Sequence, residues 1–308
     1  IGLSLVGSEM CIRDSIRLVQ SSNSLVLVKP ASFGYDEISA KTNTFQSNNN
    51  SKKLFDLVKK EHFELTKLLD ENNIAFQILN SPKECLDGIF PNNWVITYID
   101  KTYDLFSMLN LNRRLERSKE NIDFLQKAYS LKNDFSTYEK DNQFLEGTGS
   151  LVLDRINKIA YMSVSKRSSV KLATHWANRR GYILNLFSSY LDDIPIYHTN
   201  VVMFIGSNIA CIGSDLIKEN TIEALLKKHH SVITLSKKEV MNFCGNCIEV
   251  RDRENNKILL MSSRAYSNFS KKNLLELSSF YPKILHTNLT NIENVGGGSL
   301  RCMILELF

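Results

Sequence analysis

Five apolar, strand-like runs recur along the chain at nearly equal spacing, and this regularity most constrains the fold. The runs occupy residues 90–97, 144–153, 197–205, 243–250 and 296–307, and each begins with a short polar segment. One polar residue from each segment gives separations of 53, 52, 48 and 56 residues: Asn93, Glu146, His198, Asn246 and Cys302. A period near fifty residues is typical of a repeat architecture.

Helical stretches alternate with these apolar runs. The sequence predicts helices over residues 51–72, 116–129, 166–180, 214–229 and 271–280. Gly181 directly follows the third helix, where a glycine commonly ends a helix. In the first helix most apolar side chains fall on one broad stripe, as expected of a helix packed on a sheet. The alternation of strands and helices predicts an α/β protein.

The arrangement of the repeats decides where the polar segments lie. Repeats of this size could stack linearly or close radially, and five near-equal units without obvious capping repeats favour closure. Closure would bring five polar residues, distant in sequence, to one central cavity. The competing interpretation is that any α/β protein of this length divides into roughly equal pieces.

The first fifteen residues require separate treatment. They start without Met and lack the basic start, long apolar stretch and cleavage site of a signal peptide. The string VGSEMCIRDS resembles translated sequencing-adapter read-through. We therefore expect a non-native leader at residues 1–15, which includes Cys11, and a single domain over residues 16–308.

Composition limits the classes of partner. The 38 basic and 33 acidic residues give a net charge of only +5, without the dense basic stripe that nucleic-acid binding requires. Six cysteines in 308 residues do not form a secreted disulfide scaffold, which favours a reducing, cytoplasmic location. No window reaches the roughly 18 apolar residues of a membrane helix. Assembly into a homo-oligomer is compatible with this composition.

Motifs for metals and cofactors are weak. Cys244 and Cys247 have C-x-x-C spacing, but no second ligand pair follows at zinc-finger distance. The chain has no phosphate-binding lysine motif, and the glycines at 296–298 precede a strand-like run instead of a helix. We therefore predict neither a metal nor a cofactor.

Cys302 is a candidate nucleophile because of its surroundings. A cysteine within an apolar strand is more often an inert, buried side chain. Here the sequence Gly296-Gly297-Gly298-Ser299 comes just before it. Three glycines permit backbone conformations and close approaches that other residues do not, so this turn could expose the sulfur to a ligand.

His198 and Glu146 could complete a catalytic group. Most of the other histidines lie in helical or charged stretches, which makes His198 the best candidate for a general acid and base. Glu146 lies between apolar Phe144-Leu145 and a Gly-Thr-Gly turn, where an unpartnered acid would be costly to bury. A protonated histidine would be its partner, and nucleophilic catalysis uses such a Cys, His and carboxylate group.

These motifs together resemble the amidinotransferase/arginine deiminase superfamily. The resemblance runs from about Ser22 to the C-terminus and looks closest to the citrulline-utilisation hydrolases. It rests on five motifs: FPNNW at 90–94, NRRxER at 112–117, FLEGTGS at 144–150, YHTN at 197–200 and GGGSLRCM at 296–303. It implies a pentein fold, a five-bladed α/β propeller of ββαβ units with a Cys, a His and an acid around its central cavity.

The resemblance also assigns roles to residues. Cys302 matches the nucleophile, His198 the acid and base, and Glu146 the carboxylate that orients the histidine. Arginine deiminases usually have aspartates at the positions of Asn93 and Asn200. Neutral amides suit a ureido group better than a guanidinium cation, which favours citrulline. The substrate α-carboxylate needs a fork-shaped donor, for which Arg113, Arg114 and Arg167 are the candidates.

The expected activity is hydrolysis of citrulline to ornithine, carbon dioxide and ammonia through a thiocarbamate on Cys302. An arginine deiminase, dihydrolase or amidinotransferase is the alternative within enzymes, because the same thiolate chemistry serves a guanidino carbon. A non-catalytic binding propeller, like the ribosome-associated translation factors of this architecture, is the alternative outside them. A binding protein has no need of the cysteine, histidine and acid together.

Overall fold

The computed structural model describes residues 18–48, 53–219 and 221–308, so the expected leader at 1–15 and Cys11 lie outside the described residues. The strands are β1 (Ser24–Lys29), β2 (Ala75–Asn80), β3 (Val95–Thr97), β4 (Thr102–Leu105), β5 (Ser130–Asp134), β6 (Val152–Asp154), β7 (Ile159–Ser163), β8 (Ile183–Phe187), β9 (Tyr190–Leu191), β10 (Ile194–Pro195), β11 (Met203–Ile205), β12 (Ile209–Ile212), β13 (Ser231–Thr234), β14 (Ile248–Arg251), β15 (Lys257–Ser262), β16 (Lys283–Thr287) and β17 (Leu305–Leu307). The helices are α1 (Glu37–Ala40), α2 (Leu54–Glu71), α3 (Leu111–Arg114), α4 (Lys119–Gln126), α5 (Gly147–Ser150), α6 (Val170–Arg180), α7 (Thr199–Val202), α8 (Thr221–Leu226), α9 (Lys237–Met241), α10 (Ser263–Asn268), α11 (Lys271–Phe280) and α12 (Thr290–Gly296).

One sheet topology recurs five times in the described part of the chain. The three-stranded sheets have the orders β17-β1-β2, β3-β4-β5, β6-β7-β8, β11-β12-β13 and β14-β15-β16. In each sheet the first pair is antiparallel and the second is parallel. A parallel pair needs a crossover connection, and α2, α4, α6, α8 and α11 lie on these crossovers. The predicted α/β class is confirmed.

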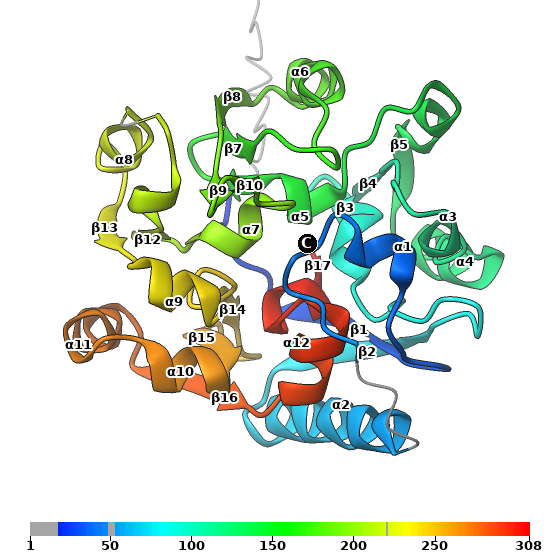
Figure 1. Cartoon of the computed structure of the whole chain (residues 1–308), viewed down its shortest axis with the longest axis horizontal. Helices are drawn as coiled ribbons and strands as arrows, with labels where there is room; N and C mark the ends of the chain where they lie inside the picture. The colour runs from blue at the N-terminus through cyan, green and yellow to red at the C-terminus, as the bar shows by residue number, and fades with distance from the viewer. Residues whose placement is uncertain (1–17, 49–52, 220) are drawn as a thin grey trace, which may run out of the picture.

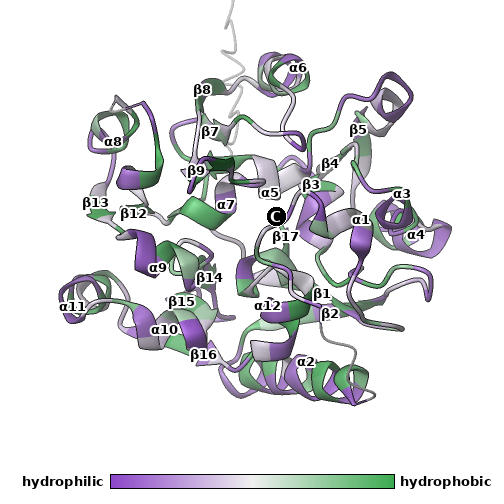
Figure 2. Ribbon diagram, in the orientation of Figure 1, coloured by the Kyte–Doolittle hydropathy of each residue, from purple (hydrophilic) through white to green (hydrophobic). Residues whose placement is uncertain are grey.

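The five sheets lie around a common centre, with the crossover helices at the periphery (Figure 1). Hydrophobic and hydrophilic residues alternate on these outer helices (Figure 2). In α2 the side chains of Leu54, Val58, Leu65 and Leu69 are buried, as the apolar stripe predicted. The first strands of neighbouring sheets contact one another, β17 with β3, β6 with β11, and β11 with β14, and β17 lies near the centre of the view (Figure 1). The turns that precede these strands also meet, since α5 contacts both α7 and the turn at Pro91–Asn93.

The structure confirms two of the helix predictions and contradicts a third. The prediction of 271–280 coincides with α11, and α6 ends at Arg180 because Gly181 takes a left-handed conformation with φ of 67°. The prediction of one helix over 214–229 is wrong. The chain forms a 3-10 turn at Ser214–Leu216 and only later α8, because Ile217 is extended and forms a β-bridge to Ser189.

The predicted strand-like runs begin as helical turns, which is a second correction. Pro91–Asn93 forms a 3-10 turn before β3, α5 precedes β6, α7 precedes β11, and Leu300–Met303 forms a 3-10 turn before β17. Cys302 therefore lies in a turn and not in a strand. Pro91 is the first residue of one of these turns, and Gly147, with φ of +41°, is the first residue of another. Their backbone preferences interrupt the extended conformation at these two points.

Candidate active site

The structure brings the five periodically spaced polar residues together. His198 Nε2 lies 2.8 Å from Glu146 Oε2. The amide nitrogens of Asn246 and Asn200 lie 3.3 and 3.5 Å from the sulfur of Cys302. Asn93 and His198 both lie against Gly149, since a methyl group built there would be 2.5 Å from Asn93 Oδ1 and 2.7 Å from His198 Cε1. A glycine is required at this position.

The carboxylate of Glu146 is buried but ionised. Burial alone would raise its pKa, but the charge of Arg167 and the hydrogen bond from His198 hold the pKa at about 2, below the usual 4.5. The backbone N–H of Leu109 also donates to Oε1 at 3.0 Å. An ionised carboxylate only accepts hydrogen bonds, so Nε2 of His198 carries the proton between them.

His198 is thereby fixed in one tautomer. Its pKa is lowered from 6.5 because burial outweighs the hydrogen bond and charge of Glu146. A neutral ring with its proton on Nε2 leaves Nδ1 free to accept a proton. This is the arrangement of an oriented general base.

The sulfur of Cys302 faces two amide donors. The thiol is 3% exposed, and the Nδ2 groups of Asn246 and Asn200 point toward it. Asn246 also donates to the backbone oxygen of Asn200 at 2.8 Å, which fixes its amide. N–H donors would stabilise the negative charge that develops on a sulfur as it attacks, and the thiol itself lies 3.6 Å from Oδ1 of Asn246. Asn246 was not among the predicted site residues, although its place in the fifty-residue period indicated it.

The glycine turn positions Cys302 as the sequence indicated. Gly297 has φ of +66°, a conformation that favours glycine. A methyl group on Gly298 would lie 2.9 Å from the ring of Phe90 and 3.3 Å from the Cβ atom of Cys302. The backbone N–H of Cys302 donates to the oxygen of Ser299 at 3.0 Å. Packing on Phe90 therefore sets the position of the thiol.

Two buried amide oxygens in the centre are available to a ligand. Within the described residues, Asn93 Oδ1 and Asn200 Oδ1 have no hydrogen-bond partner. Both side chains are at least 97% buried, with exposed fractions of 3% and 2%. A buried acceptor without a donor is unfavourable. N–H groups of a ureido or guanidino ligand would satisfy both oxygens.

The three candidate arginines point in different directions. Arg113 and Arg167 are buried, and both act electrostatically on Glu146 and His198. Arg114 instead donates to the oxygen of Met108 and forms an ion pair with another carboxylate outside the centre, that of Glu139. Arg113 also pairs with a carboxylate, because its Nε and Nη2 donate to Glu116 at 2.6 and 3.2 Å. The ion pair of Arg167 with Glu146 is longer, at 3.5 Å, so the geometry favours Arg167 over Arg113 and Arg114 as the donor to a substrate carboxylate.

Asp87 is a further acid that the sequence reasoning missed. It is 2% exposed, and its Oδ1 lies 3.8 Å from Arg113 Nε but accepts no hydrogen bond from the described residues. Burial raises its pKa despite the charge of Arg113. No periodic signal distinguished this residue, because it precedes the 90–97 segment instead of lying within it.

The segment that includes α1 covers the site. Arg167 donates to the oxygen of Ser39 at 3.1 Å, and Gln46 donates to the oxygen of Gly296 at 2.9 Å. Asn43 Nδ2 lies 3.4 Å from the oxygen of Gly297. This chain passes across the centre of the ring (Figure 1). The reactive groups are therefore enclosed in this structure.

The described residues contain neither a metal-binding cluster nor a membrane-spanning helix. Residues 18–48, 53–219 and 221–308 contain no group of three or more His, Cys, Asp or Glu side chains placed to hold a metal ion. Within the same ranges no helix is long and apolar enough to cross a membrane.

A thiol, an imidazole and a carboxylate at the centre of five ββαβ sheets define the class of cysteine hydrolases with the pentein fold. A family model described as "N,N dimethylarginine dimethylhydrolase, eukaryotic" matches residues 29–308. The chain belongs to this family, and this membership makes it a hydrolase of linear carbon–nitrogen bonds. Comparison with curated proteins gives no match.

Solved structures share the fold at low sequence identity. The N-terminal domain of ArgZ, in a variant covalently bound to a reaction intermediate, has a TM-score of 0.75 and 15% identity, covering 92% of this chain and 97% of that one. ArgZ is described as an arginine dihydrolase from cyanobacteria, and this chain spans 40% of its full length. A dimethylarginine dimethylaminohydrolase adduct with S-methyl-L-thiocitrulline has a TM-score of 0.65 and 11% identity, covering 92% and 99%.

Proposed function

We propose that the protein hydrolyses citrulline to ornithine, carbon dioxide and ammonia. The observation that carries this proposal is the pair of neutral amide oxygens of Asn93 and Asn200, which have no hydrogen-bond partner among the described residues. The amide of Asn200 lies 3.5 Å from the sulfur of Cys302, and Asn93 lies with His198 against Gly149. The two oxygens accept hydrogen bonds from the ureido N–H groups without requiring a cation. A guanidinium would instead bring a positive charge that these two neutral amides do not compensate.

The proposed reaction has two steps. The proton of the Cys302 thiol passes to His198, and the thiolate attacks the ureido carbon. His198 returns this proton to the departing nitrogen, so ammonia leaves and a thiocarbamate remains on the sulfur. A water molecule then gives a proton to His198 and attacks the same carbon. The carbon–sulfur bond breaks, and the carbamate formed loses carbon dioxide to give ornithine.

Substrate orientation in this proposal follows from the charged groups. Arg167 binds the α-carboxylate, the buried charge of Arg113 adds to the attraction, and Asp87 accepts from the α-ammonium group. Each of these side chains is buried, so the ion pairs would form away from bulk water and be strong. Glu146 holds His198 in its reactive tautomer and contacts no substrate atom.

Hydrolysis of arginine is the second candidate. The structural relatives favour it, because ArgZ is described as an arginine dihydrolase and AgrE, with a TM-score of 0.75, 17% identity and coverage of 92% of this chain and 40% of that one, has been crystallised with L-arginine. The ionised carboxylate of Glu146 also lies near the centre and would partly compensate a cation.

Purified protein supplied separately with citrulline and arginine distinguishes the candidates. The proposal expects ornithine and ammonia in equal amounts from citrulline, with kcat/KM for arginine lower by at least about tenfold. Cys302→Ala should remove turnover of citrulline while leaving the unfolding transition in place. Efficient turnover of arginine without turnover of citrulline would replace the first candidate with the second.

The proposal extends to the rest of the chain. It places the protein closest to the citrulline-utilisation hydrolases, interprets the five sheets as the blades of a propeller, and treats residues 16–308 as one catalytic domain. The five repeats of one topology support the propeller. A cytoplasmic location is consistent with Cys85, Cys211, Cys244, Cys247 and Cys302 being free thiols.

A further inference from the structure

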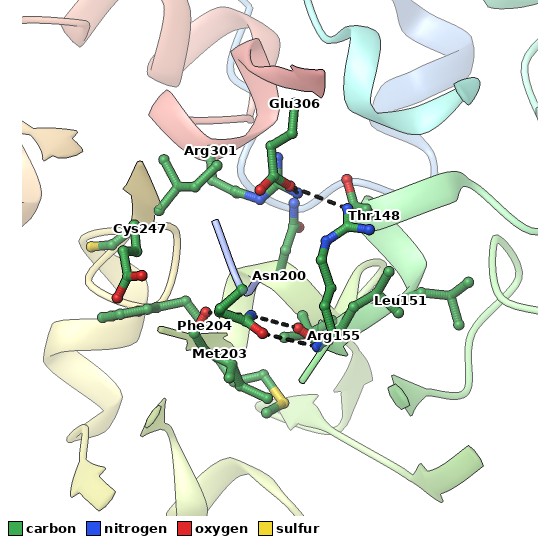
Figure 3. A pocket seen from close by; sticks show the side chains of 15 residues that line it. Thr148, Leu151, Arg155, Asn200, Met203, Phe204, Cys247, Arg301 and Glu306 are labelled. Atoms are coloured by element: carbon green, nitrogen blue, oxygen red, sulfur yellow. Dashed lines mark hydrogen bonds and ion pairs between the residues drawn. The ribbon is translucent and has the colours of Figure 1, made fainter. Parts of the chain in front are cut away.

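A small cavity with a mixed polar and apolar lining lies beside the proposed reaction centre. Its volume is about 40 Å³. Its polar lining residues are Gln20, Thr148, Arg155, Asn200, Glu249, Arg301 and Glu306, and the other eight are apolar. In the close view these side chains come from different parts of the ring and surround the space together (Figure 3).

The cavity and the thiol are separated by one side chain. Asn200 lines the cavity, and its Nδ2 group lies 3.5 Å from the sulfur of Cys302. The Oδ1 atom of the same amide has no partner among the described residues, although Asn200 is only 2% exposed. A small molecule in the cavity could therefore bind Asn200 and lie next to the reacting carbon.

The direction of the substrate places its leaving group toward this cavity. Arg167 contacts the covering segment through Ser39 and Thr42, so the α-carboxylate end of the substrate lies under that segment. The ureido end extends to Cys302 and Asn200, at the cavity side. Because the covering segment closes the other side, the hydrolytic water needs a source within the protein.

The cavity is large and polar enough to hold water. A space of this size accommodates about two or three water molecules, each of which needs two to four polar partners. Glu306 lies at the wall, 3.2 Å from Arg301 Nη2 and 3.5 Å from Arg155 Nη2 (Figure 3). These groups and the amide of Asn200 supply both donors and acceptors.

We propose that this cavity supplies the hydrolytic water and receives the ammonia while the covering segment is closed. The inference rests on the proposed function and concerns the same site. Ammonia released in the first step moves into the cavity, and a water molecule moves from the cavity to the thiocarbamate. The oxygen of this water bonds to the carbonyl carbon, the carbon–sulfur bond breaks, and His198 takes the proton.

A cavity-filling substitution tests the inference. Val152 lines the cavity from β6, and Val152→Leu adds one methylene group to it. Val250→Leu is the matched control, because Val250 is a fully buried strand valine outside the cavity lining. With citrulline, we expect Val152→Leu to keep the initial burst of ammonia and to release ornithine about tenfold more slowly. The covalent enzyme should accumulate in rapid-quench mass spectra.

A second variant and a second measurement keep the test decisive. Ile205→Phe fills the same cavity from β11 and replaces Val152→Leu if that variant fails to fold. Normal ornithine release from a folded cavity-filled variant, equal to that of Val250→Leu, would overturn the inference. A high-resolution crystal structure of the unmodified protein should also show an ordered water hydrogen-bonded to Asn200 Oδ1, and a dry cavity would overturn it too. Failure of the unmodified protein to release ammonia from citrulline would instead refute the proposed function.

Discussion

His198 Nε2 lies 2.8 Å from Oε2 of Glu146, and both side chains are almost completely buried. The two residues are 52 positions apart in the sequence and belong to the polar segments of two successive sheets. The ionised carboxylate determines which ring nitrogen carries the proton. The chemistry of the site therefore depends on how two repeats are placed against each other.

Glu146→Gln should lower kcat without removing the histidine. A glutamine side chain fits the same space but carries no charge to orient and stabilise the protonated ring. We expect kcat to fall by about 10²-fold to 10⁴-fold, the usual range for acid and base catalysis. Steady-state kinetics with citrulline measure the effect, and a kcat equal to that of the unmodified protein would exclude this role.

The same carboxylate should make stability depend on pH in acid. Its pKa is depressed to about 2 in the folded protein, from a usual value of 4.5. It therefore stabilises the fold above pH 4.5, and this contribution disappears as the pH falls from about 4.5 to about 2. The loss should be about 3 kcal/mol. Denaturant unfolding across this range should show a steeper loss for the unmodified protein than for Glu146→Gln.

Changing the two amides to acids should move the preference from citrulline to arginine. The double variant Asn93→Asp, Asn200→Asp places two carboxylates in the centre of the site. They attract a guanidinium cation, and the substitutions remove two amide donors. We expect the ratio of kcat/KM for arginine to that for citrulline to rise by about 10²-fold. An unchanged ratio in a folded variant would show that these residues do not select the substrate.

Arg167 and Arg114 form a pair of test and control. Arg167→Lys loses the fork that can bind a carboxylate in two places, so KM for citrulline should rise by at least about tenfold. Arg114→Lys should leave KM near its original value, because Arg114 contacts Glu139 and the oxygen of Met108. Citrulline with its α-carboxylate converted to an amide should be equally poor for the unmodified protein and Arg167→Lys. Equal effects of the two substitutions on KM would contradict the assignment.

Two glycines with different surroundings test the packing of the centre. A methyl group at Gly149 would meet Asn93 and the ring of His198, whereas a methyl group at Gly181 would meet no atom of the described residues within 4 Å. Gly149→Ala should reduce kcat/KM by at least about a hundredfold through displacement of these side chains. Gly181→Ala should cost about 1 kcal/mol of stability from its left-handed backbone but retain activity. Thermal unfolding and kinetics of both variants separate these effects.

Spacing and composition predicted the class of the fold because they report on many residues at once. The apolar runs and the stripe of α2 depend on burial, which a single sequence displays directly. The meeting of Asn93, Glu146, His198 and Cys302 followed from the same period, because equivalent positions of repeats that surround one centre must face each other.

Other features could not be predicted because they depend on tertiary contacts. The helix expected over 214–229 is broken by the β-bridge of Ile217 to Ser189, a partner distant in sequence. The sequence did not single out Asp87, and it did not rank Arg113, Arg114 and Arg167 as carboxylate donors. The partners of a side chain become known only from the structure. The segment containing α1 carried no motif, and its position over the site is set by contacts with Gly296 and Arg167.

The covalent intermediate offers the most direct test of the central claim, that Cys302 attacks the ureido carbon of citrulline. Protein mixed with citrulline, quenched in acid within one turnover and digested can be examined by mass spectrometry. We expect the peptide containing Cys302 to carry citrulline less one ammonia. Ornithine formation with this cysteine unmodified, or with the adduct on another residue, would contradict the account.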